Sequence, residues 1–297
     1  MPSLAQKLLF WYDRNGRNLP WRSTRDPYRI LVSEMMLQQT QVSRVLLFYK
    51  RWLKRFPNWK ALAAATNAEV VKAWAGLGYN RRALMLRNIA EKIIFSGEPK
   101  TQAGWEKFKG IGPYTSRAIA IFALHERVLP IDTNIRRVSA RLLLGIPYPN
   151  PKDDERIQKK IDLLLPKRGQ FYDVPQAIFD LATSICTKMP NCQICPLKSA
   201  CSTAKKFLLE RVKIPKVMIK KFAERKHDGK PYPDRIYRGR ILTLVRNSPW
   251  IEKKMVGNAV DPSFQKQVDT KWIQAMIGRL QKERFIKITN GKLSLAE

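Results

Sequence analysis

The hydrophobic positions follow a helical period through the first two thirds of the chain. In residues 40–56, Val42, Val45, Tyr49 and Leu53 fall near one stripe, with basic residues between them. Further segments with helical spacing are 67–75, 82–95, 114–124, 133–144, 155–165 and 175–186. Gly, Pro, Asn and Asp stand at the breaks, and strands with alternating apolar residues are missing from this pattern. The pattern predicts an all-α fold up to about residue 205.

The pattern changes near the end of the chain. Residues 232–297 contain two helical stretches, at 235–246 and 269–285, followed by two short apolar runs around Asn290-Gly291, a strong hairpin signal. Helices followed by a hairpin predict a small winged-helix-like domain, which would bind DNA or dock a protein. Residues 206–231 are lysine-rich and predict a basic linker, which either follows a phosphate-rich surface or is a solvated connector.

The amino-acid composition indicates the kind of binding partner and the cellular compartment. Of 297 residues, 56 are Lys or Arg and 24 are Asp or Glu, a formal charge of +32 that favours a polyanionic partner, nucleic acid before an anionic membrane. No apolar run approaches the roughly 20 residues that span a bilayer, and the amino terminus lacks the pattern of a secretory signal. All four cysteines fall within Cys186–Cys201, which favours a metal site in a reducing compartment over disulfides.

Two short motifs flank one predicted helix. Residues 110–115 (GIGPYT) place Gly110 and Gly112 in a tight turn before a helix amino terminus, an arrangement that holds a phosphate without reading sequence. A plain connection between helices is the alternative. Asp132 opens the next helix, where an aspartate commonly serves only as an N-cap. The distance of one helix between the motifs favours an aspartate aimed at a bound backbone.

A glycine turn followed by an aspartate one helix later resembles the pattern of the helix-hairpin-helix DNA glycosylases, the relatives of endonuclease III. Residues 33–42 (SEMMLQQTQV), 74–79 (WAGLGY) and 19–22 (LPWR) are similar to the MutY-type adenine DNA glycosylases. The resemblance runs from about residue 5 to about residue 205. It implies an iron–sulfur helical domain from residues 1–22 and 130–205 and a six-helix barrel domain over 23–129.

The cysteines have the spacing Cys186-x5-Cys192-x2-Cys195-x5-Cys201. Four thiolates this close suit a zinc ion or a [4Fe–4S] cluster. The resemblance implies the cluster, in a structural role. The family usually has six residues in the first interval, so the interval of five predicts an altered loop.

Cleavage of an N-glycosidic bond needs a proton donor for the departing base and a negative group facing the sugar. Glu34 lies in an apolar run, where desolvation keeps a carboxyl protonated, and is the candidate acid. Asp132 is expected to stay ionised and stabilise the sugar cation. Tyr114 stands where lyase-active relatives carry a lysine; since tyrosine forms no Schiff base, we predict a monofunctional enzyme.

The target base must leave the duplex to reach Glu34. The resemblance implies that Gln38 and Tyr79 enter the base stack and that Leu77 contacts the opposing base. Arg22, beside Trp21, is expected at the DNA backbone or the pocket. Asn80 departs from the family, in which many members have a second tyrosine here.

Together these features predict a base-excision repair enzyme that removes adenine mispaired with 8-oxoguanine or guanine. The alternatives are a thymine or uracil mismatch glycosylase and a non-catalytic winged-helix DNA-binding protein. The residues after the cysteines do not resemble the Nudix-like domain of larger relatives. The expected partner is double-stranded DNA with a mismatch or an oxidised base, bound by a monomer in a prokaryotic cytoplasm at the nucleoid, with no membrane attachment.

Overall fold

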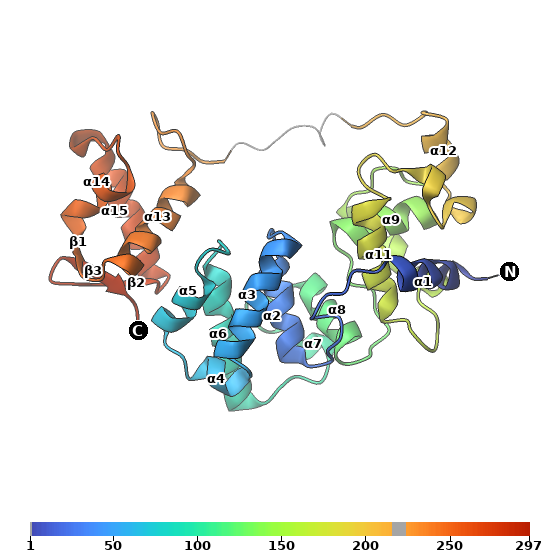
Figure 1. Cartoon of the computed structure of the whole chain (residues 1–297), viewed down its shortest axis with the longest axis horizontal. Coiled ribbons are helices and arrows are strands. Elements are labelled where there is room, and N and C mark those ends of the chain that lie inside the picture. The colour runs from blue at the N-terminus through green and yellow to red at the C-terminus, as the bar shows by residue number, and fades with distance from the viewer. Residues whose placement is uncertain (1, 216–223) are drawn as a thin grey trace. The chain divides into compact units, whose positions relative to one another are not determined.

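Helices make up nearly all the regular structure in residues 2–215 and 224–297, the part of the chain that this computed structural model describes (Figure 1). Before residue 210 the α-helices are α1 (Leu4–Asn15), α2 (Pro27–Leu37), α3 (Val42–Arg55), α4 (Trp59–Ala63), α5 (Asn67–Trp74), α6 (Arg81–Ser96), α7 (Gln102–Glu106), α8 (Pro113–Phe122), α9 (Thr133–Leu143), α10 (Asp154–Gln158), α11 (Asp173–Ser184) and α12 (Ala204–Leu208). Short 3-10 turns are η1 (Pro151–Asp153), η2 (Ile161–Leu163), η3 (Cys192–Ile194) and η4 (Lys198–Ala200). The predicted all-α fold is confirmed for this part of the chain.

One predicted helix is interrupted. The helix expected over 155–165 is instead α10 followed by the turn η2. Pro166 disfavours helical geometry in the residue before it, and the guanidinium of Arg127 binds the carbonyl oxygens of Leu165 and Pro166. The backbone there is therefore satisfied without a continuous helix.

Local signals explain where several helices begin. Ser3 forms a capping box with Gln6 at the start of α1, and Thr66 forms one with Glu69 at the start of α5. Pro113 occupies the first turn of α8, where its missing N–H costs nothing. These caps satisfy backbone donors that each first turn would otherwise leave unpaired.

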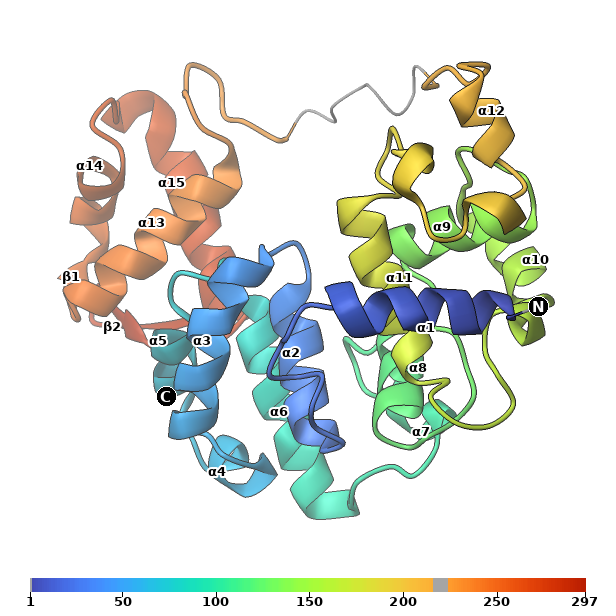
Figure 2. The same ribbon diagram turned by 45° about the vertical axis from the view of Figure 1, so that its right-hand side comes forward.

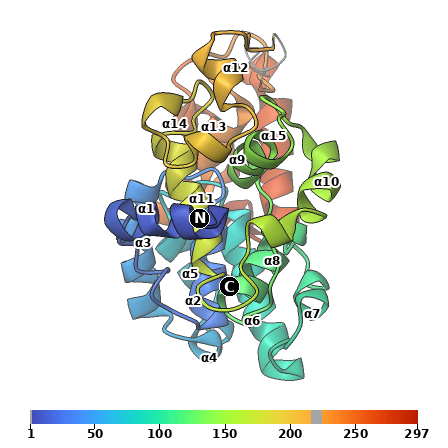
Figure 3. The same ribbon diagram turned by 90° about the vertical axis from the view of Figure 1, so that its right-hand side faces the viewer.

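The first compact unit comprises Met1–Glu34 and Pro99–Lys221. Within it α1 and α9 pack against α11, and Figure 2 shows α1 lying across α11. α7 and α8 pack as neighbours on either side of the glycine turn (Figure 3). The buried residues of α8, from Ala118 to Phe122, lie in the core of this unit, which fixes the helix that carries Tyr114.

The second compact unit comprises Met35–Glu98 and Phe222–Glu297. Its amino-terminal part is built around α6, against which α4 and α5 pack. Trp52 and Trp74 meet edge to face, with ring centroids 5.2 Å apart, in the core beneath the loop that follows α5. The predicted domain boundaries at residues 22, 129 and 205 differ from these compact units and stay a prediction.

The carboxy-terminal segment has the order helix, strand, helix, helix, hairpin. Its elements are α13 (Asp234–Asn247), β1 (Ile251–Glu252), the turn η6 (Lys253–Met255), α14 (Val256–Val260), α15 (Lys266–Lys282), β2 (Ile286–Thr289) and β3 (Lys292–Leu295). The three strands form one antiparallel sheet in the order β1-β3-β2. Both turn residues of the hairpin, Asn290 and Gly291, have positive φ, as the tight turn requires. The two predicted helices and the hairpin are present in the predicted order, while the assignment of a separate winged-helix-like domain stays a prediction; the strand β1 and helix α14 are too short for the pattern to predict.

The hydrophobic core of this segment extends into the preceding helices. Val71 of α5 and Leu84 of α6 belong to the same buried cluster as Trp272, Met276 and Phe285. The predicted linker over 206–231 lies in part outside the described residues. Residues 224–231, at the end of this predicted linker, are described and are not all in solvent, since Lys230 is 8% exposed.

Candidate active site

Glu34 lies on the buried face of α2. Its neighbours from Ile30 to Met36 are buried, and Glu34 itself is 8% exposed. The pKa of its carboxyl is raised to about 7: burial raises this pKa most, a hydrogen bond from Tyr114 lowers it, and the nearby Asp132 carboxylate raises it. Near neutral pH the carboxyl is therefore protonated in a large share of molecules.

Asp132 is the N-cap of α9. Its Oδ1 accepts the backbone N–H groups of Asn134 and Ile135 at 2.8 and 2.7 Å, and its Oδ2 accepts the Asn134 side chain at 2.9 Å. Burial raises the Asp132 pKa, whereas these donors and the guanidinium of Arg137 lower it. Glu34 has a single stabilising donor and Asp132 has three, which favours the ionised form at Asp132 more than at Glu34.

Tyr114 contacts Glu34 and lies within the electrostatic reach of Asp132. It stands in the first turn of α8, and its phenolic hydroxyl donates to Glu34. Burial together with the charges of Glu34 and Asp132 raises the pKa of Tyr114 well above its usual 10, so the phenol stays neutral. The structure thus brings together the three residues predicted to be catalytic.

The glycine turn lies between α7 and α8, in the same unit. Gly110 has φ +99°, which an L side chain adopts only with strain, and Gly112 caps α8 with an extended backbone. A Cβ at Gly112 would meet no atom within 4 Å, so the space in front of the helix is open. Lys107 and Lys109 are exposed beside the turn. Backbone N–H groups at the start of α8 and these cations suit a phosphate.

The loop residues predicted to enter DNA belong to the second unit. Gln38 and Tyr79 are exposed, Tyr79 by 52%, and Tyr79 has φ +46°. Leu77 is only 5% exposed. The predicted contact of Leu77 with a base stays a prediction.

Arg82 is a residue that sequence reasoning missed. Its buried guanidinium donates to the carbonyl oxygens of Met35 at 2.7 Å, Gln38 at 2.5 Å and Gly78 at 3.1 Å. These bonds tie the end of α2 to the loop that carries Tyr79. Acceptors of this kind are backbone atoms, so no sequence signal identifies them.

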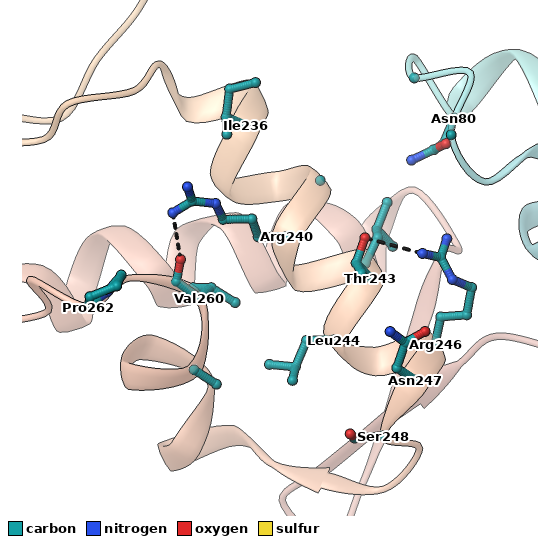
Figure 4. Close-up of a pocket in the computed structure, with 15 residues that line it drawn as sticks. Asn80, Ile236, Arg240, Thr243, Leu244, Arg246, Asn247, Ser248, Val260 and Pro262 are labelled. Atoms are coloured by element: carbon teal, nitrogen blue, oxygen red, sulfur yellow. Dashed lines mark hydrogen bonds between the residues drawn. The ribbon is translucent and has the colours of Figure 1, made fainter.

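A groove separates this loop from α13 within the second unit. Gly76, Gly78 and Asn80 line one wall, and Arg240 and Arg246 come from the other (Figure 4). Arg240 donates to the carbonyl oxygen of Val260 at 3.0 Å, and Arg246 donates to Thr243 at 3.3 Å. A second pocket nearby is lined by Gln38, Tyr79, Arg235 and Arg238. The exposed loop is therefore bordered by arginines that the motif analysis did not identify.

Arg22 has a structural role instead of the predicted contact with DNA. Its guanidinium binds both oxygens of Asp180 on α11, at 2.7 and 2.9 Å, and its side chain is 9% exposed. Arg17 binds the same carboxylate, and the bonds from Arg22 and Arg17 lower the Asp180 pKa against the effect of burial. The adjacent Trp21 is buried. We therefore do not propose either residue as a DNA contact.

All four cysteines line one small cavity after α11, and none is in a disulfide. Burial and the neighbouring thiols raise the pKa of Cys192 and raise that of Cys195 to about 11. A single zinc ion needs donors about 2.3 Å from one centre. In residues 2–215 and 224–297, no group of three or more His, Cys, Asp or Glu side chains is placed to hold such an ion.

Arg141 fixes the loop between the first two cysteines. This fully buried guanidinium donates to the carbonyl oxygens of Thr187 at 2.6 Å and Lys188 at 3.0 Å, and lies 3.4 Å from the Cys186 sulfur. It brings a positive charge to the cavity, which would offset the charge of coordinating thiolates. Four thiol side chains and this charge are the donor chemistry that a metal ion or cluster held by thiolates would use.

Comparison with known proteins identifies the family. Residues 32–166 match the model of the HhH-GPD superfamily base excision DNA repair proteins. An adenine DNA glycosylase of Mycobacterium tuberculosis is 40% identical over 195 residues, 64% of this chain and 64% of that protein. One from Mycolicibacterium smegmatis is 34% identical over 277 residues, 90% of this chain and 85% of that protein. The chain belongs to the HhH-GPD superfamily of base excision DNA repair proteins. Within it the similarity is to the MutY-type adenine DNA glycosylases, as the motifs predicted.

Solved structures agree on the fold. A thermostable thymine-DNA glycosylase is 25% identical with a TM-score of 0.62, over 68% of this chain and 95% of that one. An endonuclease III–DNA complex has a TM-score of 0.57 at 20% identity, over 68% and 94%. The helix-hairpin-helix glycosylase fold is therefore confirmed. No helix among the described residues is long and apolar enough to cross a membrane.

Proposed function

We propose that this protein is a monofunctional DNA glycosylase that hydrolyses the N-glycosidic bond of an adenine flipped out of duplex DNA, opposite 8-oxoguanine or guanine. The observation that carries the proposal is the buried Glu34 carboxyl, with a pKa of about 7, in contact with Tyr114 and beside the Asp132 carboxylate. Relatives that are 34 to 40% identical are named adenine DNA glycosylases, which supports the same substrate.

The chemistry follows from the two acids. Glu34 gives its proton to N7 of the adenine, and the bond from the sugar carbon to N9 breaks with its electron pair going to the base. The base leaves neutral, and the sugar becomes an oxocarbenium ion that the Asp132 carboxylate stabilises. Water then adds to the sugar carbon, and the ionised Glu34 accepts the proton that this water releases. Since Tyr114 cannot form a Schiff base, the strand stays uncut.

Gln38 and Tyr79 are proposed to enter the base stack when the adenine leaves it. Gly110, Gly112 and the first turn of α8 are proposed to bind phosphates of the same DNA. The exposure of Gln38 and Tyr79 and the open space at Gly112 support these roles.

We also propose that Cys186, Cys192, Cys195 and Cys201 hold a [4Fe–4S] cluster. When bound, the cluster supplies structure, because the hydrolysis needs no electron transfer. The shared cavity and the Arg141 charge support it. We propose further that the protein acts as a monomer on nucleoid DNA in a prokaryotic cytoplasm; light scattering tests the monomer.

Base release from four duplexes tests the substrate. The duplexes place A opposite 8-oxoguanine, A opposite G, T opposite G and U opposite G, at equal concentrations under single turnover. We expect adenine from the first two. Predominant release of a pyrimidine would favour the thymine or uracil alternative, which the likeness to a thymine-DNA glycosylase keeps worth testing. Tight duplex binding with no release from any of the four would favour a non-catalytic binding protein.

A further inference from the structure

A groove in the winged-helix-like segment has no part in the proposed excision. It lies between the amino-terminal half of α15, the end of β1 with η6 and α14, and the hairpin tip, and it encloses about 810 Å³. Every residue that lines it falls between Glu252 and Lys292, so the groove depends on this one segment. It is separate from the groove beside Asn80, which includes α13.

The groove is strongly basic. Its lining contains Lys253, Lys254, Lys266 and Lys292, all exposed, and a single acid, Glu252. Glu252 is already paired with Lys254 at 2.8 Å. Its charge is thus offset by one lysine, and the other three cations give the groove its sign.

The surrounding segment has the same bias. Residues 224–297 contain 16 Lys and Arg against 8 Asp and Glu. Two of those acids, Asp261 and Asp269, are buried and bind the buried Lys230 at 2.7 and 2.6 Å. Lys230 offsets one of these two buried negative charges, and the rest of the segment has 15 Lys and Arg against 6 Asp and Glu, so the field at its surface is positive.

The side of α15 that lines the groove carries polar and basic residues suited to contact with duplex DNA. Lys266, Thr270 and Gln274 recur every four residues and line the groove, while Trp272 and Met276 on the other side of the helix are buried. α14 and α15 form a helix-turn-helix, whose second helix typically lies in the major groove. The hairpin tip at Asn290-Gly291 borders the same groove, where it can reach the adjoining backbone.

We propose that this groove is a second duplex-binding surface, on which α15 enters the major groove and the three lysines contact phosphates of undamaged DNA next to the lesion. The choice of DNA over another polyanion rests on the proposed function. The surface supplies affinity for duplex and leaves the cleavage step unchanged, because none of its residues belongs to the site of Glu34, Tyr114 and Asp132. Thr270 and Gln274 offer hydrogen bonds without a charge, which favours binding with little dependence on sequence.

The test compares two triple variants of the full chain. The groove variant is Lys253→Ala, Lys266→Ala, Lys292→Ala. The control variant is Lys54→Ala, Lys60→Ala, Lys92→Ala, which removes the same charge from exposed positions of α3, α4 and α6, away from α15 and the groove lining. Fluorescence anisotropy with an undamaged duplex, repeated over a series of salt concentrations, gives the affinity and its salt dependence. Circular dichroism checks that both variants fold.

For the groove variant we expect at least a tenfold loss of affinity and a salt slope smaller by about 2 to 3, one phosphate contact for each lysine. The control should lose clearly less in both measures. Equal losses in the two variants, or an unchanged groove variant, would overturn the proposal; the second result would favour a protein partner for the groove. Single-turnover base release at saturating enzyme is measured in parallel and should match the wild type. If the wild type releases no base while the groove variant still loses affinity, the proposed function fails and the binding surface stands.

Discussion

The phenolic hydroxyl of Tyr114 donates a hydrogen bond to the carboxyl group of Glu34, and this contact opposes the rise in the Glu34 pKa that burial causes. A hydrogen bond from a neutral phenol stabilises the ionised carboxylate more than the protonated acid. Tyr114 therefore does more than exclude a lysine from this position. It sets the pH range over which Glu34 holds its proton.

The first prediction concerns Tyr114→Phe. Removing the hydroxyl should raise the Glu34 pKa above about 7, so that the acid stays protonated to higher pH. The wild-type rate of base release should fall as pH rises through about 7, with Glu34 protonated in about a tenth of the molecules at pH 8. In Tyr114→Phe this falling limb should move to higher pH, as measured by single-turnover base release between pH 5.5 and 9. A limb that stays in place, or moves down, would mean that the tyrosine does not tune the acid.

The second prediction concerns Glu34→Gln. Without a proton to give, base release should fall by about 10²- to 10⁴-fold while duplex affinity is kept. Glu91→Gln, an exposed glutamate on α6, serves as the matched control and should leave release unchanged. Strong release by Glu34→Gln would remove Glu34 from the mechanism.

The same substitution should change stability in a way that depends on pH. The folded-state pKa of Glu34, about 7, exceeds the usual 4.5, so the folded protein binds the proton more tightly than the unfolded chain. This contribution is complete below pH 4.5 and is lost as pH rises through about 7. Glutamine does not titrate. Relative to the wild type, Glu34→Gln should therefore gain about 2 to 3 kcal/mol in unfolding free energy between pH 5 and pH 8, measured by urea denaturation. An equal difference at both pH values would contradict the assigned pKa.

Two substitutions at Asp132 separate its role as a helix cap from its role as a negative charge. It caps α9 through backbone N–H groups and also places a negative charge near Glu34. Asparagine caps nearly as well but carries no charge. Asp132→Asn should keep the melting temperature within a few degrees and lose base release, whereas Asp132→Ala should lose release and about 1 kcal/mol of stability. If Asp132→Asn keeps its activity, the carboxylate is only a cap.

Asp132 also illustrates how far sequence reasoning carried. A helix cap and a carboxylate facing the sugar were competing interpretations of this residue, and the structure shows the cap while placing the same carboxylate near enough to Glu34 to affect its pKa. Helix periodicity predicted most helices because it records one buried face. It could not reveal that Arg22 binds Asp180, since that partner lies 158 residues away. Neither could it find Arg82 or Arg141, whose partners are mainly carbonyl oxygens, which every residue has.

The cysteine cavity gives a prediction about cofactor content. Cys192→Ser should lower bound iron and acid-labile sulfide and weaken the broad visible absorption of an iron–sulfur cluster. Removal of the metal by a chelator should destabilise the region around η3 and η4 more than the site of Glu34, as hydrogen exchange would measure. Zinc in place of iron and sulfide in the purified wild type would show that the site holds a single ion after all.

The last prediction concerns the arginine that holds the loop. Arg82 is 6% exposed, and burial lowers its pKa to about 10, so it stays charged at neutral pH. Lysine lacks the planar fork that reaches Met35, Gln38 and Gly78 together, so Arg82→Lys leaves buried carbonyl oxygens unpaired. We expect a loss of about 2 to 4 kcal/mol in unfolding free energy. Because the same bonds order the loop before Tyr79, duplex affinity should also fall, by about tenfold.

The exposed neighbour on α6 provides the control. Arg81→Lys keeps the charge at a position that is open to solvent, and it should change stability by less than about 0.5 kcal/mol. If Arg82→Lys releases base at the normal rate once DNA is saturating, Arg82 positions the loop and takes no part in the chemical step. If Arg82→Lys instead binds as tightly as Arg81→Lys, the order of this loop does not limit DNA binding, and the role of Arg82 is confined to stability.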